Sequence, residues 1–455
     1  MRQIAQFYTL FWVIYFPTCI AFNDVGPMKW VDEIMTVILI AFTMAQMGSR
    51  YVMGPRRSFY RHETQVVKKE AGVFLLVLAF YTCYSLLFGE NIQKAVWRDM
   101  VQWIRPFSVI YCTWLLNPRF TLRQKNLMLY SMIATMVAWL FLHTEAVTGE
   151  SAEFAVLGQL AMCTGLAWYL FKPQSRQNMY IATALVLAGM LAPKFKYLGE
   201  VVCFVYVIFF LKKHLKFKDP KTIAVLVLMM AAVLFVTWSK FEKYYVTGFT
   251  DQAAYRMARP ETYRIAFTQI LWDYFPFGPG MGTWGCAAAA DFYSPLLYKY
   301  KMNDVWGCSP EFRSFIADAF YPTLCQLGVV GIFFFCWFWK RRLVAFNKIH
   351  DMRYYKVVWI TFFCLAIEQS ADTSFLSGKG MGYCMLIALC LNANRNLDLA
   401  AATRGKGGTA ATPQGRYGSR YGSRYTRRYG QPYTTKTKAD ETKAPAAEEE
   451  TPTQP

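Results

Sequence analysis

The first 393 residues consist of continuous apolar stretches separated by short polar linkers. Most stretches approach the roughly 17–25 residues that an α-helix needs to cross the hydrocarbon core of a bilayer. We predict twelve of them, at 4–22, 31–47, 71–89, 96–116, 127–147, 152–171, 178–193, 198–211, 221–239, 317–339, 356–371 and 376–393. Because the apolar positions are continuous rather than alternating, the pattern favours helices over a transmembrane β-barrel.

The composition agrees with an all-α polytopic membrane protein. Hydrophobic residues make up 55% of the 455-residue chain and charged residues only 17%, whereas soluble domains carry roughly 25% charged residues. Aromatic residues, at 18%, are more abundant than an ordinary soluble core needs. These values exclude a soluble enzyme, a disulfide-stapled secreted module and a disordered regulator.

The positive charges have a regular position along the chain. The formal net charge is +20, but the Lys and Arg residues gather after each even-numbered stretch, where the positive-inside rule places cytoplasmic linkers. These basic clusters lie within 50–69, 119–125, 172–176, 212–221 and 340–356. We therefore expect a multi-pass protein with both termini in the cytoplasm. The charge pattern suits membrane lipid and not nucleic acid.

Two segments interrupt this alternation. Residues 240–316 form a long linker that the charge pattern places outside the membrane, and their Tyr, Trp, Pro and Gly content predicts a folded external cap. Residues 396–455 are rich in Gly, Ser, Thr, Pro, Arg and Glu and cannot bury a core, so we expect a disordered cytoplasmic tail. The remaining units are helices 1–9 in 1–239 and helices 10–12 in 317–395.

The cysteine and histidine residues give no metal-binding pattern. The four histidines show no zinc-helix spacing, and no Asp-x-Asp or phosphate-binding loop is present. We therefore expect chemistry without a metal or other cofactor. Only Cys286 and Cys308 lie in the external segment, where a disulfide between them and two separately buried thiols are both open.

The external segment holds the most informative residues. Its stretch 261–275 is amphipathic and predicts a helix that Pro276 ends. A Gly-rich turn follows, whose backbone N–H groups could cradle an anion. Three arginines precede this turn or lie in the helix, and together with the turn they suggest a phosphate or pyrophosphate site. The residues of this candidate site are Arg256, Arg259, Arg264, Gly278 and Gly280. The alternative is an interfacial helix whose arginines meet lipid phosphates.

Further candidates lie near the outer membrane boundary or inside the apolar stretches. Lys194 and Lys196 are basic residues on the outer side, against the positive-inside trend, which suggests either a functional role or contact with lipid phosphate. Asp318 is an acidic residue at the outer start of the tenth stretch. Arg98 and Arg105 lie within the fourth stretch, where they either line a cavity or form structural ion pairs.

These residues resemble the O-antigen ligase and O-antigen polymerase family of bacterial membrane glycosyltransferases. The family pattern is an Arg-led helix, then Pro, a small apolar residue and Gly-x-Gly, then an outer polar residue leading into a Gly-x-x-Gly helix. Here these are Arg264, the run from Pro276 to Gly280, and Asp318 followed by the run from Gly328 to Gly331. The resemblance implies about twelve spans, a location in the bacterial inner membrane and a large periplasmic loop between helices 9 and 10.

The resemblance also implies an activity. Such enzymes transfer a glycan from an undecaprenyl-pyrophosphate donor to a lipid-linked glycan or to the lipid A core, alongside other polysaccharide-assembly proteins. Arg264 would stabilise the leaving pyrophosphate, with Lys194 or Lys196 as a second cation, and Asp318 would orient or deprotonate the acceptor hydroxyl. Ligases of the family carry His-Asn where this chain has Ala317-Asp318, so the polymerase is the leading hypothesis. The alternatives are a ligase and, from another class, a transporter or flippase for lipid-linked sugar.

Overall fold

The structure is a computed structural model that describes residues 2–21, 30–52, 59–142, 155–191, 194–212, 214–215, 220–236, 238–247 and 256–405. All regular secondary structure in these ranges is helical, which confirms the predicted all-α class. Each of the twelve predicted stretches coincides with a helix or a run of helical turns. The tail residues 406–455 and part of the external segment, 248–255, lie outside the described residues.

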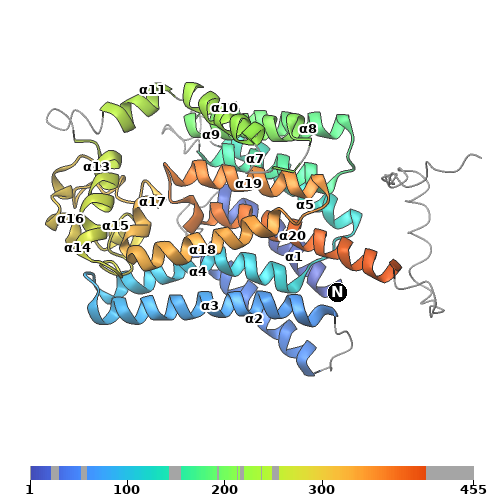
Figure 1. The fold of residues 1–455 in the computed structure, drawn as a ribbon, viewed down its shortest axis with the longest axis horizontal. Helices are drawn as coiled ribbons and strands as arrows, with labels where there is room; N and C mark the ends of the chain where they lie inside the picture. The colour runs from blue at the N-terminus through green and yellow to red at the C-terminus, as the bar shows by residue number, and fades with distance from the viewer. Residues whose placement is uncertain are drawn as a thin grey trace, which may run out of the picture. The chain divides into compact units, whose positions relative to one another are not determined.

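The part of the chain up to Thr247 supplies most of the bundle, drawn in blue to green in Figure 1. Its α-helices are α1 (Arg2–Tyr15), α2 (Val31–Val52), α3 (Phe59–Phe88), α4 (Gln93–Leu116), α5 (Leu122–Leu142), α7 (Ala155–Phe171), α8 (Arg176–Ala188), α9 (Phe195–Val205), α10 (Pro220–Val236) and α11 (Trp238–Phe241). Short π- or 3-10 turns extend several of them, namely η1 (Phe16–Ala21), η3 (Gly189–Leu191), η4 (Tyr206–Phe210) and η5 (Glu242–Thr247).

The remaining elements form the cap, which corresponds to the segment predicted to be external, and the last helices of the bundle. The cap comprises α13 (Ala258–Ile265), η6 (Ala266–Ile270), α14 (Leu271–Asp273), α15 (Ala287–Asp291), α16 (Pro295–Lys299) and η7 (Met302–Asp304). The chain then returns through α17 (Phe320–Thr323), η8 (Leu324–Leu327), α18 (Gly328–Phe346), α19 (Met352–Gln369), η9 (Ser374–Leu376) and α20 (Gly378–Gly405). The predicted cap helix is therefore one continuous run of helical turns from Ala258 to Asp273.

Four helical segments within the described residues are long and apolar enough to cross a membrane. They are Arg2–Ala21, Val31–Gly48, Val66–Phe88 and Phe320–Phe346, and Val156–Phe171 is a shorter apolar helix. Large apolar side chains on these helices point outward, for example Leu76 of α3, which is 71% exposed. In water such exposure would be costly, whereas lipid solvates it. The chain is therefore a helical membrane protein.

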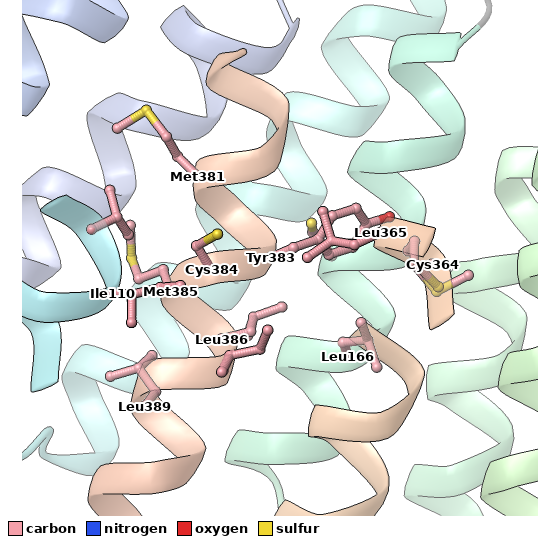
Figure 2. Close-up of a cluster of buried hydrophobic side chains, with 14 of the residues drawn as sticks. Ile110, Leu166, Cys364, Leu365, Met381, Tyr383, Cys384, Met385, Leu386 and Leu389 are labelled. Atoms are coloured by element: carbon pink, nitrogen blue, oxygen red, sulfur yellow. The ribbon is translucent and has the colours of Figure 1, made fainter. Parts of the chain in front are cut away.

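The helix α20 lies at the centre of the bundle. Its residues from Met381 to Leu391 are all buried, as expected of a helix that is apolar on every side. Figure 2 shows Met381, Tyr383, Cys384, Met385, Leu386 and Leu389 of this helix among side chains such as Ile110, Leu166 and Leu365. These partners come from α4, α7 and α19, so residues far apart in the sequence share one core.

The cap gathers at one end of the bundle. Figure 1 shows α13 to α16 together at the end away from the N-terminus. The cap has an apolar core of its own, which includes the buried side chains of Ile265, Ile270, Trp284 and Leu296. The segment thus contributes helical turns and buried side chains at this end of the bundle, within the one compact unit that spans Met1–Asp398.

Candidate functional site

Five charged side chains meet where the cap rests on the ends of the bundle helices, and we use the word outer for this end of the bundle. We call this group, formed by Lys196, Arg259, Asp318, Glu368 and Asp372, the outer charged cluster. Its members come from α9, α13, the segment before α17, the end of α19 and the turn after α19. Tertiary packing alone brings these five positions together.

Arg259 and Asp318 form the cap side of the outer charged cluster. Nη2 of Arg259 donates to Oδ2 of Asp318 at 2.6 Å, and the two side chains are only 17% and 24% exposed. One turn further along the same helix face, the hydroxyl of Tyr263 donates to the carbonyl of Ser370 at 3.0 Å. Residues four apart on a helix share a face, so α13 directs Arg259 and Tyr263 toward the membrane-embedded helices.

Lys196 forms the bundle side of the cluster. Its Nζ donates to Oε2 of Glu368 at 2.6 Å and to Oδ2 of Asp372 at 3.0 Å. Lys379, at the start of α20, lies 3.9 Å from the same Asp372 carboxylate. Cations and carboxylates therefore alternate across the cluster, which is the condition for keeping charges at the edge of an apolar bundle.

The electrostatic surroundings raise the pKa of Asp318 to about 6. Burial is the main cause, and it is opposed by the charge and hydrogen bond of Arg259; Asp372 adds a further increase through like-charge repulsion. Burial also favours the neutral form of Asp372, but Lys196 and Lys379 hold the pKa of that carboxyl below its usual range. Asp318 is therefore the carboxylate of this site that is poised to exchange a proton near neutral pH.

Arg264 lies on a different face of the helix from Arg259. Five residues correspond to about 140° of rotation around an α-helix, so the two arginines point to different surroundings. Arg264 donates from Nε and Nη2 to the carboxylate of Glu261 at 2.8 and 2.7 Å. Arg256 joins the same carboxylate at 2.6 Å. The structure therefore pairs Asp318 with Arg259, whereas the sequence had suggested Arg264 for the catalytic position.

The Gly-rich turn has a structural role. The N–H of Gly278 donates to a carbonyl four residues earlier, and the N–H of Gly280 donates to the carbonyl of Gln326 at 3.0 Å. The N–H of Gly282 reaches the buried carboxylate of Asp99 at 3.1 Å. These N–H groups are engaged within the protein, so the predicted anion cradle at Gly278 and Gly280 is not available in this conformation. The turn instead anchors the cap on the outer ends of α3 and α4.

The arginines of α4 form ion pairs with α2. Arg105 donates to Asp32 at 2.6 Å and also pairs with Glu33. Arg98 pairs with Glu33 as well, and its Nε lies 3.5 Å from a carboxylate oxygen of Asp291 in the cap. Of the two alternatives that the sequence left open, the structure favours ion pairs over cavity lining, with acidic partners from α2 that spacing along the chain does not reveal.

The two external cysteines are free thiols, so the possible disulfide is not formed. Sγ of Cys286 accepts a hydrogen bond from the N–H of Ala289 at 3.3 Å and so caps the start of α15. Cys308 is buried separately in the cap core. Lys194 is exposed immediately before α9, whereas Lys196 faces the cluster.

Within the described ranges, His, Cys, Asp and Glu residues form no group that could hold a metal ion.

The sequence gives no sign that Glu368 and Asp372 are partners of Lys196, because they lie more than 170 positions away along the chain. The spacing of residues along the helix was the signal that could have identified Arg259, because Arg259 and Tyr263 are four residues apart and share one helix face.

Comparison with family models and with curated proteins gives no match for this chain.

Proposed function

We propose that this protein is a polysaccharide polymerase of the O-antigen or capsule type. It would transfer a glycan from an undecaprenyl-pyrophosphate donor to a lipid-linked glycan acceptor, at the outer face of the bacterial inner membrane. The observation that carries the proposal is the joining of Lys196, Arg259 and Asp318 where the cap meets the bundle. This arrangement combines a base and two cations beside membrane helices, as the reaction requires.

The chemistry follows from the positions of these side chains. The acceptor hydroxyl attacks the anomeric carbon while the bond from that carbon to the phosphate oxygen breaks. Asp318 takes the hydroxyl proton and becomes neutral, and the electron pair of the broken bond leaves with the lipid pyrophosphate. Arg259 then loses its counter-ion at the moment when the leaving oxygen gains charge. Its guanidinium is thereby released to stabilise the leaving group, with Lys196 as the second cation.

The proposal includes the topology that the sequence predicts. About twelve spans with cytoplasmic termini place α9, α13 and the start of α17 at the outer boundary of the membrane, where the pyrophosphate of a lipid carrier lies. The placement of the cap opposite the N-terminus supports this orientation (Figure 1). Other polysaccharide-assembly proteins would supply the donor and receive the product.

The test compares Asp318→Asn and Arg259→Ala with Arg123→Ala in cells that display the glycan. Arg123 is an exposed arginine at the start of α5 and serves as the control for loss of one positive charge. Loss of the base or of the cation is expected to lower transfer by about 10²–10³-fold, so long-chain polysaccharide disappears in both variants and remains in the control. The amount of each variant in the membrane is measured in parallel.

The form of the glycan that remains distinguishes the alternatives. Surface display of single repeat units with loss of long chains supports the polymerase. Polymer that stays on its lipid carrier and does not reach the lipid A core identifies a ligase. Normal long-chain glycan in Asp318→Asn and Arg259→Ala would contradict both transferase proposals and favour a transporter of lipid-linked sugar.

A further inference from the structure

A second basic site lies in the cap, around a different face of α13 from the one that carries Arg259. We call it the outer basic pocket. It encloses about 360 Å³, within the range of about 300–1,000 Å³ that is typical of small-ligand sites. The residues that line it are Arg256, Glu261, Arg264, Gln269, Lys299, Tyr300 and Lys301. Four of the lining side chains are cationic and one is a carboxylate, while Asp273 and Glu90 contact the hydroxyls of Tyr300 and Tyr274 beside the pocket. Positive charge therefore remains in excess.

The single carboxylate organises the arginines of the pocket. Burial raises the pKa of Glu261, but hydrogen bonds from Arg264 and Arg256 outweigh this effect and lower its pKa overall, so it remains ionised. Arg264 uses Nε and Nη2 in this pairing, and its Nη1 makes no hydrogen bond within the described part of the chain. Glu261 therefore fixes two guanidinium planes while a donor is left for a ligand.

The lysines and the tyrosine form the opposite wall. Lys299 and Lys301 are exposed, and Nζ of Lys299 is held by the hydroxyl of Tyr274 at 2.8 Å. The hydroxyl of Tyr300 donates to Asp273 at 2.7 Å, which fixes the orientation of its ring. The wall thus combines two positive charges with one oriented aromatic ring, a combination suited to an anionic ligand that also has an apolar face.

The lining indicates which anion fits. Apart from the ring of Tyr300, the lining side chains are polar or charged, so the pocket offers no continuous apolar wall for an acyl or isoprenoid chain. The side chains of Gln269 and Tyr300 suit the hydroxyl groups of a sugar. The pocket also lies on the helix that carries Arg259, about 7–8 Å further along its axis at Arg264, so one extended glycan could contact both sites.

We propose that the outer basic pocket binds an acidic sugar of the glycan substrate, carrying a carboxylate or a phosphate group. This inference rests on the proposed transferase function and adds a substrate class to it. The pocket would select acidic repeat units, while the outer charged cluster performs the transfer.

Binding to the purified full-length protein tests the inference. The probes are trigalacturonic acid for the carboxylate, glucose 6-phosphate for the phosphate and maltotriose as the neutral trisaccharide, compared by calorimetry at low ionic strength. Lys299→Ala/Lys301→Ala is expected to weaken binding of the acidic probe by about tenfold, because two charge-assisted contacts are lost. Lys299→Arg/Lys301→Arg should retain it. The matched control is Lys94→Ala, an exposed lysine near the start of α4 outside the pocket.

Three results would overturn the inference. The first is equal binding, or no binding, of the acidic and neutral probes. The second is an effect of Lys94→Ala as large as that of the double variant. The third is evidence for another ligand. Loss of transfer of a neutral repeat unit in Lys299→Ala/Lys301→Ala would assign the pocket to pyrophosphate, and displacement of the acidic probe by anionic lipid vesicles would assign it to lipid. If Asp318→Asn leaves transfer intact while acidic sugar still binds, the transferase proposal fails and the pocket remains.

Discussion

Replacing Gly282 by alanine tests how the cap is anchored on α4. Gly282 has a φ of +77°, and a Cβ at this position would lie 2.7 Å from the carbonyl oxygen of Ala95 and 2.8 Å from its carbon. Both are backbone atoms that cannot rotate away. The left-handed conformation costs an alanine about 1–2 kcal/mol, and relief of the overlap costs about 1–3 kcal/mol more. We therefore expect anchoring to weaken by about 2–5 kcal/mol.

Hydrogen exchange measures this local change directly. The backbone N–H of Met281 donates to Ser85 at 2.7 Å, and that of Thr283 donates to the side chain of Gln326 at 3.2 Å. Both groups exchange only when the turn detaches. Since each 1.4 kcal/mol is a factor of ten, a loss of 2 kcal/mol should accelerate exchange in this peptide by about 30-fold.

Gly72→Ala is the matched control. Gly72 lies within α3, and a Cβ at this position would meet no atom within 4 Å. Alanine in a helix interior is more stable than glycine by roughly 0.5–1 kcal/mol, so exchange in α3 should slow or stay the same. Unchanged exchange around residue 282 in the Gly282→Ala protein would refute the proposed anchoring, as would equal acceleration in both variants.

Three further predictions concern the outer charged cluster and the cap. Lys196→Met leaves the Glu368 carboxylate without its cation and leaves Asp372 with only the more distant Lys379. It should therefore destabilise the protein by about 3–5 kcal/mol, whereas Lys196→Arg should retain most of the stability. Thermal unfolding in detergent measures both, and equal melting temperatures would contradict the pairing. Alkylation under denaturing, non-reducing conditions should label Cys286 and Cys308 fully, and an unlabelled disulfide-linked peptide would contradict the free thiols. Transfer activity should fall as the pH decreases through about 6, where Asp318 gains a proton. In Arg259→Ala the residual activity should fall at a higher pH, because the cation that lowers the pKa of Asp318 is lost. An unchanged pH dependence would remove Asp318 from the role of base.

Local sequence patterns were sufficient for much of the fold. The helical class and the approximate positions of most helices follow from runs of apolar residues, because a bilayer core selects apolar helices with internally satisfied backbones. The run 261–275 likewise predicted the cap helix, since amphipathic spacing is a property of neighbouring residues. The end of α20 was missed because polar residues after 393 continue the helix as far as Gly405.

The site itself was only partly accessible from the sequence. The sequence identified Lys196 and Asp318 as candidates because charged residues near a membrane boundary are costly and therefore informative. It identified Arg259 as one of three arginines beside the Gly-rich turn. It favoured Arg264 over Arg259 for the catalytic position, because the sequence does not show which face of α13 rests on the bundle and pairs with Asp318. The turn glycines show the same limit, because their sequence is compatible with an anion cradle and with close packing against α3 and α4.

The class of protein, most helix positions and the residues with unusual chemistry can thus be read from the amino-acid sequence. Packing of distant segments was needed to show that Glu368 and Asp372 neutralise Lys196, that Asp32 pairs with Arg105, and that Arg264 belongs to a second pocket with Lys299 and Lys301. This difference follows from the range of the forces involved. Backbone hydrogen bonds and hydrophobic periodicity act between near neighbours in the chain, whereas a buried charge is stabilised by whichever opposite charge the packing brings within a few ångströms.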